Sequence, residues 1–206
     1  MNYLLNVASP FGHWIVEHLR FFAKWLRRPF AIGAVAPSSR WLAAAMVDNL
    51  PELSPDEWVV ELGGGTGAFT REILRRGVCS KRLVVVERDP ALVKVLRRKF
   101  PGVLIVNGDA AELAKLIARH DIGSVGAVIS GLPLIGMPKW VQSKILSAVF
   151  QALPAGKPFI QFTYAFGSPV AYRRLGFLGR RTALIVRNLP PASVWRFERP
   201  TAANKR

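Results

Sequence analysis

The sequence predicts a doubly wound α/β fold, in which a mostly parallel sheet of seven strands is covered by helices on both faces. From Trp58 onward, short apolar runs alternate with helical patterns. The runs are continuously apolar rather than alternating, so the strands are expected to be buried on both faces, as in a parallel sheet. The chain has 206 residues, half of them hydrophobic, which suits one domain with short additional segments.

The expected elements follow the order of these runs. After Tyr164 the alternation stops, and a basic loop to Arg181 leads to two further runs separated by a short Pro-rich turn. This spacing predicts an antiparallel pair that completes the sheet. The seven expected strands are residues 58–62, 82–87, 103–107, 126–130, 158–164, 182–188 and 193–199. Four helices are expected between them: one that ends near Arg76, and three that cover residues 91–100, about 110–119 and about 140–152.

An amphipathic helix is expected over residues 11–28, ahead of this core. Its apolar side chains fall on one face at helical spacing and its charged side chains on the other. Pro29 ends it, and Ser38 or Ser39 is expected to cap a second helix. We therefore divide the chain into an N-terminal helix and turn, residues 1–37, and a core domain, residues 38–206.

The charge is strongly basic, with 29 Lys and Arg against 13 Asp and Glu. Residues 1–40 and 165–206 together carry 12 of the 16 net positive charges, and such a field attracts nucleic acid or anionic membrane. The longest uncharged run, residues 122–138, is interrupted by Gly and Pro, so no membrane-spanning helix is expected. A single cysteine, Cys79, and the absence of a signal-peptide pattern favour the cytoplasm.

A glycine-rich turn follows the first expected strand. The segment ELGGGTGAF places Gly63, Gly65 and Gly67 between a strand and a helix. Glycine permits a sharp turn and the close approach of a ligand, and the helix that follows offers free N–H donors. These features predict a nucleotide-binding turn, although a tight strand-to-helix connection alone would have the same composition.

Acidic residues end the next two expected strands. Glu87 lies twenty residues after Gly67, where a carboxylate can accept hydrogen bonds from ribose hydroxyls, and Asp109 is placed to accept from an adenine amino group. Either residue could instead cap a helix. Because parallel strands end at one edge of a sheet, the three groups are expected to form one site.

These segments, with SGLPL after the fourth strand, resemble the ordered motifs of class I S-adenosylmethionine-dependent methyltransferases. The resemblance implies that Glu61 meets the methionine amino group, Glu87 holds the ribose, and Asp109 with Ala110 faces the adenine. The cofactor-binding residues that it implies are Glu61, Gly63, Gly65, Gly67, Glu87, Arg88, Asp109, Ala110 and Ser130.

Two subfamilies share this form of the motifs. In the ribosomal RNA adenine dimethyltransferases the fourth strand ends N-L-P-Y or N-L-P-F, whereas residues 131–134 here read G-L-P-L and lack both the Asn and the aromatic residue. The sequence is more similar to the bacterial phospholipid N-methyltransferases of the PmtA type, also in the segments RRPFAIGAVAPSS and NLPPASVWRFER. This resemblance implies methylation of phosphatidylethanolamine rather than of nucleic acid, and it leaves open whether successive transfers lead to phosphatidylcholine.

Two basic, aromatic segments are expected to bind an anionic phospholipid membrane from its cytoplasmic side. The helix could instead pack on its own domain, and the later segment could be a solvated face. The expected membrane-binding residues are Trp14, Arg20, Phe22, Lys24, Trp25, Arg27 and Arg28 in the first segment, and Tyr172, Arg173, Arg174, Phe177, Arg180 and Arg181 in the second.

The expected reaction is direct displacement at the sulfonium methyl group by the lipid amine, without a metal. Burial beside the sulfonium lowers the amine pKa, so a strong base is not required. The carbonyls of Gly131 and Leu132 are expected to orient the amine, and Tyr164 to hydrogen-bond it or relay its proton. The alternatives are a ribosomal RNA adenine methyltransferase and a membrane-associated protein that binds the cofactor without turnover.

Overall fold

The computed structural model describes residues 39–165, 167–188 and 190–201. The helix expected over residues 11–28, with its expected membrane contacts, lies outside the described residues. None of the helices within the described ranges is long and apolar enough to cross a membrane.

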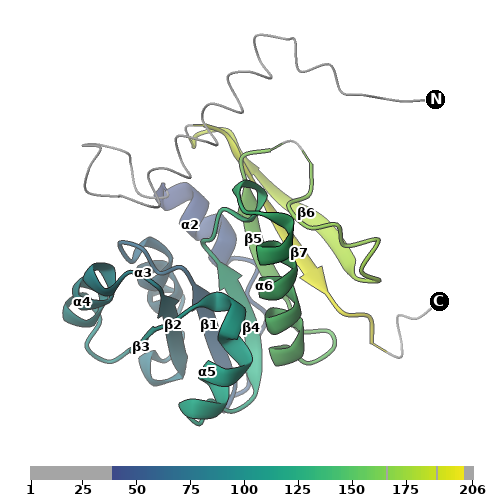
Figure 1. The fold of residues 1–206 in the computed structure, drawn as a ribbon. Coiled ribbons are helices and arrows are strands. Elements are labelled where there is room, and N and C mark those ends of the chain that lie inside the picture. The colour runs from purple at the N-terminus through teal and green to yellow at the C-terminus, as the bar shows by residue number, and fades with distance from the viewer. Residues whose placement is uncertain (1–38, 166, 189, 202–206) are drawn as a thin grey trace, which may run out of the picture. The chain divides into compact units, whose positions relative to one another are not determined.

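One seven-stranded sheet forms the centre of the described core, in the order β3-β2-β1-β4-β5-β7-β6 (Figure 1). The first five strands are parallel, whereas β7 runs antiparallel to both of its neighbours. This confirms the expected doubly wound fold and its antiparallel end. The strands are β1 (Trp58–Leu62), β2 (Leu83–Glu87), β3 (Leu104–Asn107), β4 (Val125–Ser130), β5 (Phe159–Thr163), β6 (Leu178–Ile185) and β7 (Ala192–Glu198).

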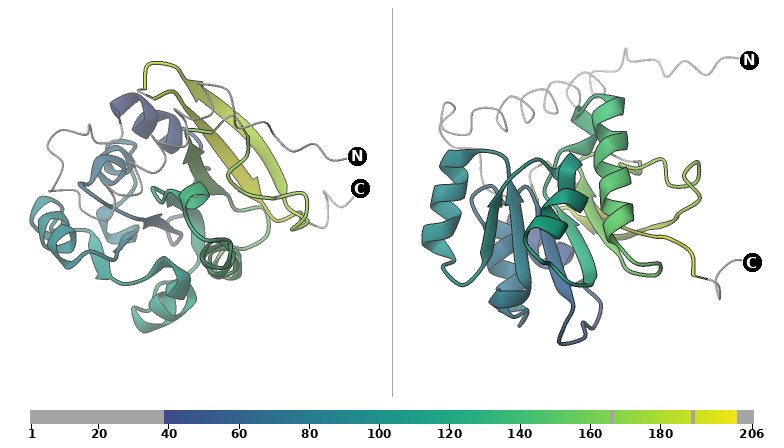
Figure 2. Two further views of the ribbon diagram at one scale, coloured as in Figure 1. Left: turned by 45° about the horizontal axis from the view of Figure 1, so that its top comes forward. Right: turned by 60° about the horizontal axis from the view of Figure 1, so that its bottom comes forward.

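Helices cover both faces of this sheet (Figure 2). Alternate residues of each strand point to opposite faces, and one set packs with α5 and α6 while the other packs with α2, α3 and α4. The helices are α2 (Arg40–Val47), α3 (Ala68–Arg75), α4 (Pro90–Lys99), α5 (Leu113–Arg119) and α6 (Lys139–Ala152), with short 3-10 turns η1 (Ser80–Arg82), η2 (Ala110–Glu112) and η3 (Leu134–Gly136).

Helix α2 begins where the sequence predicts a cap. The Ser39 hydroxyl accepts a hydrogen bond from the Leu42 N–H at 3.2 Å, which satisfies one of the donors left free at a helix start. Leu42 and Met46 are fully buried, so the helix is held mainly by its apolar face. Its amino end therefore has a fixed place on the core.

The edge strand β6 differs from its expected position. It begins at Leu178, four residues earlier than the sequence predicts, and ends at Ile185. Its pairing with β7 runs from Leu178 opposite Glu198 to Ile185 opposite Ala192, so Arg180 and Arg181 belong to the strand and not to a loop. An edge strand with one solvated side tolerates such charged residues, which is why composition alone misplaced the boundary.

The aromatic residues of the preceding segment pack on the core. The Phe177 ring stacks on Phe150 with a centroid separation of 3.9 Å, and the Tyr172 ring lies 5.8 Å from that of Phe197. Both side chains are only partly exposed. Folding therefore covers part of both rings, and the expectation that Tyr172 and Phe177 contact a membrane stays a prediction.

Substituting Gly67 tests the tight packing at the start of α3. Gly67 has φ +88° and a Cβ there would lie 2.4 Å from Phe100 Cε2, whereas Gly77 has φ +95° and open space around it. Both Gly67→Ala and Gly77→Ala add backbone strain of about 1–3 kcal/mol, but only Gly67→Ala also overpacks, by about 1–3 kcal/mol. Urea unfolding should show the larger loss for Gly67→Ala. Equal losses would contradict the packing described.

Candidate functional site

The turn between β1 and α3, residues 63–67, is named the glycine turn. Gly63, Gly65 and Gly67 all have positive φ, as L side chains rarely do. The Gly63 N–H donates to the Val86 carbonyl at 2.8 Å, which continues the pairing of β1 with β2. Among the described residues a Cβ on Gly65 would meet nothing within 4 Å, so this part of the core leaves open space for a ligand at the turn.

Glu87 holds this turn from the end of β2. One carboxylate oxygen accepts from the Gly65 N–H and the other from the Asp89 N–H, each at 2.9 Å. The residue is 9% exposed. Each oxygen retains a second acceptor position, so the carboxylate can also receive hydroxyl donors from a ligand beside the turn. Asp89, not Glu87, caps α4, which removes the alternative role considered for Glu87.

Glu61 lies at the base of the same turn and is fully buried. Its Oε2 accepts from the Thr70 hydroxyl at 2.6 Å, but among the described residues its Oε1 has no hydrogen-bond partner. Burial raises the pKa of the carboxyl to about 8, the hydrogen bonds from Thr70 oppose this rise, and the Glu87 carboxylate adds to it. A buried oxygen without a donor is costly, and a cationic amino group would supply one.

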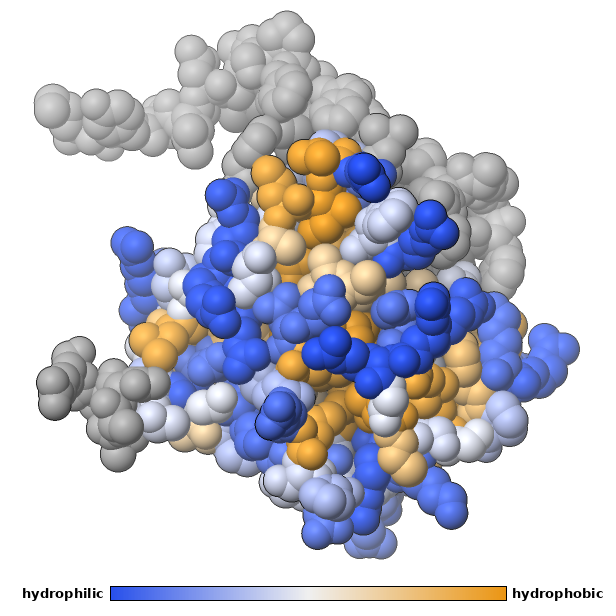
Figure 3. Space-filling model, turned by 180° about the vertical axis from the view of Figure 1, so that it is seen from behind, coloured by the Kyte–Doolittle hydropathy of each residue, from blue (hydrophilic) through white to orange (hydrophobic). Residues whose placement is uncertain are grey.

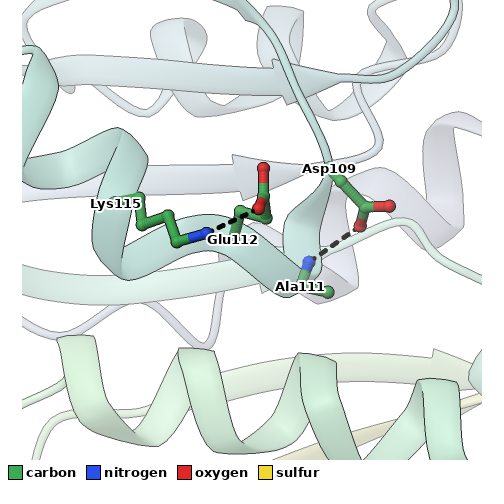
Figure 4. Close-up of polar contacts among 4 residues, drawn as sticks. All are labelled: Asp109, Ala111, Glu112 and Lys115. Atoms are coloured by element: carbon green, nitrogen blue, oxygen red, sulfur yellow. Dashed lines mark hydrogen bonds and ion pairs between the residues drawn. The ribbon is translucent and has the colours of Figure 1, made fainter.

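Asp109 follows β3 and caps the turn η2, as the close-up in Figure 4 shows. Its Oδ1 accepts from the Ala111 N–H at 2.9 Å, so the capping role considered from the sequence is present. The other oxygen points away from Ala111 (Figure 4), and Asp109 is exposed while Ala110 is buried. Its contact with an adenine, like that of exposed Arg88, stays a prediction.

The segment after β4, residues 131–138, is named the β4 loop and lies directly against the glycine turn. The Gly131 N–H donates to the Leu62 carbonyl at 2.8 Å. A Cβ on Gly131 would lie 2.8 Å from the Gly63 carbonyl oxygen, and one on Gly63 would lie 2.8 Å from Leu132 Cδ2. Glycine at position 131 thus allows the two backbones to approach, and glycine at position 63 leaves room for the Leu132 side chain.

Polar side chains fix the β4 loop. The Leu132 carbonyl accepts from Gln161 Nε2 and from the Leu134 N–H, both at 2.9 Å, so its two lone pairs are already used. The expectation that this carbonyl orients a substrate amine is corrected, and Gly131 keeps that assignment alone. Ser130 is buried and accepts from the Leu132 N–H at 3.3 Å, so it supports the loop, while its contact with a cofactor stays a prediction.

Tyr164 follows β5 and lies at the same edge of the sheet. Its ring packs edge-on against Phe162, with centroids 5.4 Å apart, and Phe162 in turn packs against Phe69 of α3. Burial raises the pKa of Tyr164, and a hydrogen bond with buried Asn188 in the β6–β7 turn opposes the rise. The hydroxyl is therefore protonated at neutral pH and acts as a donor rather than as a base.

The arginines of the second basic segment do not join this site. Tyr172 packs on Phe197, which pairs with Phe159 at the start of β5, and the Arg173 guanidinium lies 5.8 Å from the Tyr172 ring centroid. Arg173 is thus at the end of the sheet opposite the glycine turn. Arg180 and Arg181 lie along the middle of β6, and with Arg174 they are exposed.

Three residues of the site were missed by the sequence analysis. Gln161 is a polar residue in the middle of a mostly apolar strand, and this pattern could have indicated its role in the site. Thr70 lies in the first turn of α3, directly after the glycine turn. The sequence contains no such pattern for Asn188, because the β6–β7 turn lies next to Tyr164 only as a result of the pairing of β7 with β5. The described residues contain no group of three or more His, Cys, Asp or Glu that could hold a metal ion.

The sequence matches the family model described as ribosomal RNA adenine dimethylase over residues 39–116. This range contains the glycine turn, Glu87 and Asp109, and it ends before β4 and its loop. The match therefore covers the expected cofactor half of the site and leaves the other half unmatched.

Relatives of two kinds are found. An ornithine lipid N-methyltransferase of Singulisphaera acidiphila is 35% identical over 181 residues, 85% of this chain and 92% of that protein. A ribosomal RNA small subunit methyltransferase A of Chlorobium phaeobacteroides is 33% identical over 79 residues, 37% of this chain and 28% of its own length. The first similarity thus covers most of this chain, and the second covers less than two fifths of it.

A solved structure shares the fold over nearly its whole length. The magnesium protoporphyrin IX methyltransferase of Synechocystis PCC 6803, with bound S-adenosylmethionine, has a TM-score of 0.60 and 17% identity, covering 97% of this chain and all of that one.

The pKa of Glu61 predicts a pH-dependent stability for the protein without bound ligand. Its folded-state pKa of about 8 exceeds the value of 4.5 expected on unfolding, so the folded state binds more protons between these values. The free energy of unfolding should therefore fall as pH rises through this window. Glu61→Gln has no titrating group at this position, so its free energy of unfolding, measured with urea, should fall less between pH 4.5 and about 8 than that of the unchanged protein. Parallel pH profiles for the two proteins would contradict the assignment.

Proposed function

The chain belongs to the class I S-adenosylmethionine-dependent methyltransferases, and we propose that it methylates the amine of a membrane lipid. S-adenosylmethionine is its cofactor, and the described residues fit it. The unpaired Oε1 of Glu61 suits the methionine amino group, and the open glycine turn beside Glu87 suits the ribose. When bound, the cofactor supplies an electrophilic methyl group on a positively charged sulfur.

The observation that carries the lipid proposal is the β4 loop. It lies against the glycine turn, so a methyl acceptor held by this loop would be next to the methyl donor. The loop presents glycine, proline and leucine, without the amide and the aromatic ring that recognise a flipped adenine. An aliphatic amine needs only hydrogen-bond acceptors and an environment that excludes water, and this loop can offer both.

The support for the ribosomal RNA alternative comes from matches over part of the chain. The family match ends at residue 116, and the Chlorobium relative covers 37% of this chain. In contrast, the similarity to the ornithine lipid N-methyltransferase of Singulisphaera covers 92% of that protein and 85% of this chain. The part that distinguishes acceptors therefore favours a lipid.

The chain supports amine methylation by positioning and dehydration. Holding a primary amine with a pKa of about 10.4 neutral at pH 7 costs about 4–5 kcal/mol in water, and burial beside a sulfonium reduces this cost. The Gly131 carbonyl accepts an amine N–H and so directs the nitrogen lone pair to the methyl carbon. The methylated ammonium group would then give up one proton to solvent water, with the Tyr164 hydroxyl accepting it and passing its own proton on.

Two head groups are candidates for the acceptor. Phosphatidylethanolamine and an ornithine lipid both present a primary amine, and the printed activity of the Singulisphaera relative favours the ornithine lipid. The sequence resemblance to the PmtA type favours phosphatidylethanolamine and its methylated products. We place the reaction at the cytoplasmic face of the membrane.

Labelled methyl transfer tests the acceptor class. The full chain is incubated with methyl-labelled S-adenosylmethionine, total RNA and anionic vesicles containing an ornithine lipid or phosphatidylethanolamine. The proposal predicts label in the lipid extract, and the vesicles that become labelled identify the head group. Label confined to RNA, or no transfer by protein that binds the cofactor in calorimetry, would overturn it. Glu87→Ala, which removes the side chain that holds the glycine turn, is the control for cofactor-dependent label.

Tyr164→Phe tests the role of the hydroxyl. The ring and its contacts with Phe162 remain, so cofactor binding should change little, and loss of the hydrogen bond with buried Asn188 should lower the free energy of unfolding by about 1 kcal/mol. The kcat should fall at least about tenfold with loss of the proton relay. Tyr172→Phe removes the same group at the opposite end of the sheet and should keep kcat. An unchanged kcat in Tyr164→Phe would remove Tyr164 from the reaction.

A further inference from the structure

Exposed tryptophans and basic side chains gather at the end of the sheet where β1, β4 and β5 finish. Trp140 is 64% exposed, Val186 70% and Trp41 42%, which is unusual for large apolar side chains. We name this set the carboxyl-edge surface. It consists of Arg40 and Trp41 of α2, Trp140 and Lys144 of α6, and Leu184, Val186 and Arg187 at the end of β6 and in its turn.

The β6–β7 turn and α2 meet on one side of the β4 loop. Thr163 at the end of β5 pairs with Ser193 near the start of β7, so the turn before β7 lies beyond the end of β5. The Arg187 guanidinium of this turn lies 5.3 Å from the Trp41 ring centroid. The amino end of α2 is therefore at the same edge, as both ribbon figures show (Figures 1 and 2).

Helix α6 brings Trp140 to the other side of the β4 loop. The helix starts at Lys139, directly after this loop, and packs on the opposite face of the sheet from α2. Trp140 is in its first turn, with Lys144 Nζ 5.2 Å from the ring centroid. The β4 loop and Tyr164 thus lie between two exposed tryptophans, each with a cation over its ring.

The charge of this surface has one sign. Arg40 and Arg187 both lie over Trp41, at 4.5 and 5.3 Å from the ring centroid, and the first turns of α2 and α6 contain no acidic residue. Seen from behind, hydrophobic side chains gather at the upper end of the molecule with hydrophilic ones around them (Figure 3). Tryptophan beside Arg or Lys is the combination enriched where proteins meet the head groups of a bilayer.

We propose that the carboxyl-edge surface is the core domain's own contact with an anionic bilayer, which places the β4 loop over the lipid head groups. This proposal rests on the proposed lipid substrate. Leu184 is 59% exposed beside Val186, and aliphatic side chains gain free energy by entering an apolar phase but little beside RNA phosphates. A bound lipid amine would then reach the Gly131 carbonyl without leaving the membrane surface.

A matched pair of double variants of the full chain tests the position of this contact. Trp41→Ala with Arg187→Ala removes one exposed apolar and one basic side chain from the surface. Leu175→Ala with Arg174→Ala removes an exposed apolar and a basic side chain at the opposite end of the core, in the competing segment that the sequence predicts at the membrane. Partition is measured by sedimentation with vesicles of phosphatidylglycerol and phosphatidylcholine, which contain no primary amine.

The first pair should weaken partition by about tenfold or more, since one basic residue near an anionic surface contributes about fivefold and an inserted indole adds to it. The Leu175 and Arg174 pair should change partition by less than about threefold, through net charge alone. Trp140→Ala with Lys144→Ala is a second surface variant, from a different helix, and should resemble the first. Thermal unfolding confirms that each variant is folded.

Equal losses in the surface and control variants would overturn the proposal, as would loss of RNA binding in the surface variants with unchanged vesicle partition. Methyl transfer separates this outcome from failure of the proposed function. If the intact chain labels an aminolipid while the variants partition alike, only the surface assignment fails. If the surface variants lose partition but no lipid is labelled, the membrane contact stands and the substrate assignment fails.

Discussion

The close approach of two backbones, at Gly63 and Gly131, is the constraint on which the rest of the site depends. The glycine turn and the β4 loop follow neighbouring parallel strands, and a Cβ at either glycine would lie 2.8 Å from an atom of the opposite segment. Glu87 fixes the turn through the Gly65 N–H, and Gln161 fixes the loop through the Leu132 carbonyl. In the proposed reaction, the methyl donor and its acceptor would thereby be held by segments that follow adjacent strands, so that positioning would supply much of the catalytic effect.

Two buried carboxylates at the same turn have different environments and different tasks. Glu87 receives two backbone N–H donors, whereas Glu61 receives the Thr70 hydroxyl on one oxygen and has a pKa raised to about 8 by burial. Glu61 is thus the group whose charge state a cationic ligand would change most. The turn combines one carboxylate that organises the backbone with one that is prepared for a positive charge.

The cofactor half of the site could be predicted from the sequence because its signals are local. The glycines, Glu61, Glu87 and Asp109 each stand at a strand end that the apolar pattern marks, and the structure brings them to one edge. Gln161 and Asn188 could not be assigned in this way, because their roles arise from register: Gln161 pairs with Ser130, and the β6–β7 turn reaches Tyr164 through β7. The core packing of Tyr172 and Phe177 could not be predicted either, since aromatic residues beside arginines have the same composition in a core-packed segment and in a membrane contact.

The proposed acceptor and the proposed membrane orientation depend on the same geometry, in which the β4 loop lies between two exposed tryptophans and beside the glycine turn. A structure of the full chain with S-adenosylhomocysteine and a short-chain aminolipid tests this geometry most directly. The account predicts that the lipid amine lies within hydrogen-bond distance of the Gly131 carbonyl, faces the cofactor sulfur, and has its acyl chains directed towards Trp41 and Trp140. An amine bound away from Gly131, or acyl chains directed towards Arg173 and Arg174, would contradict it.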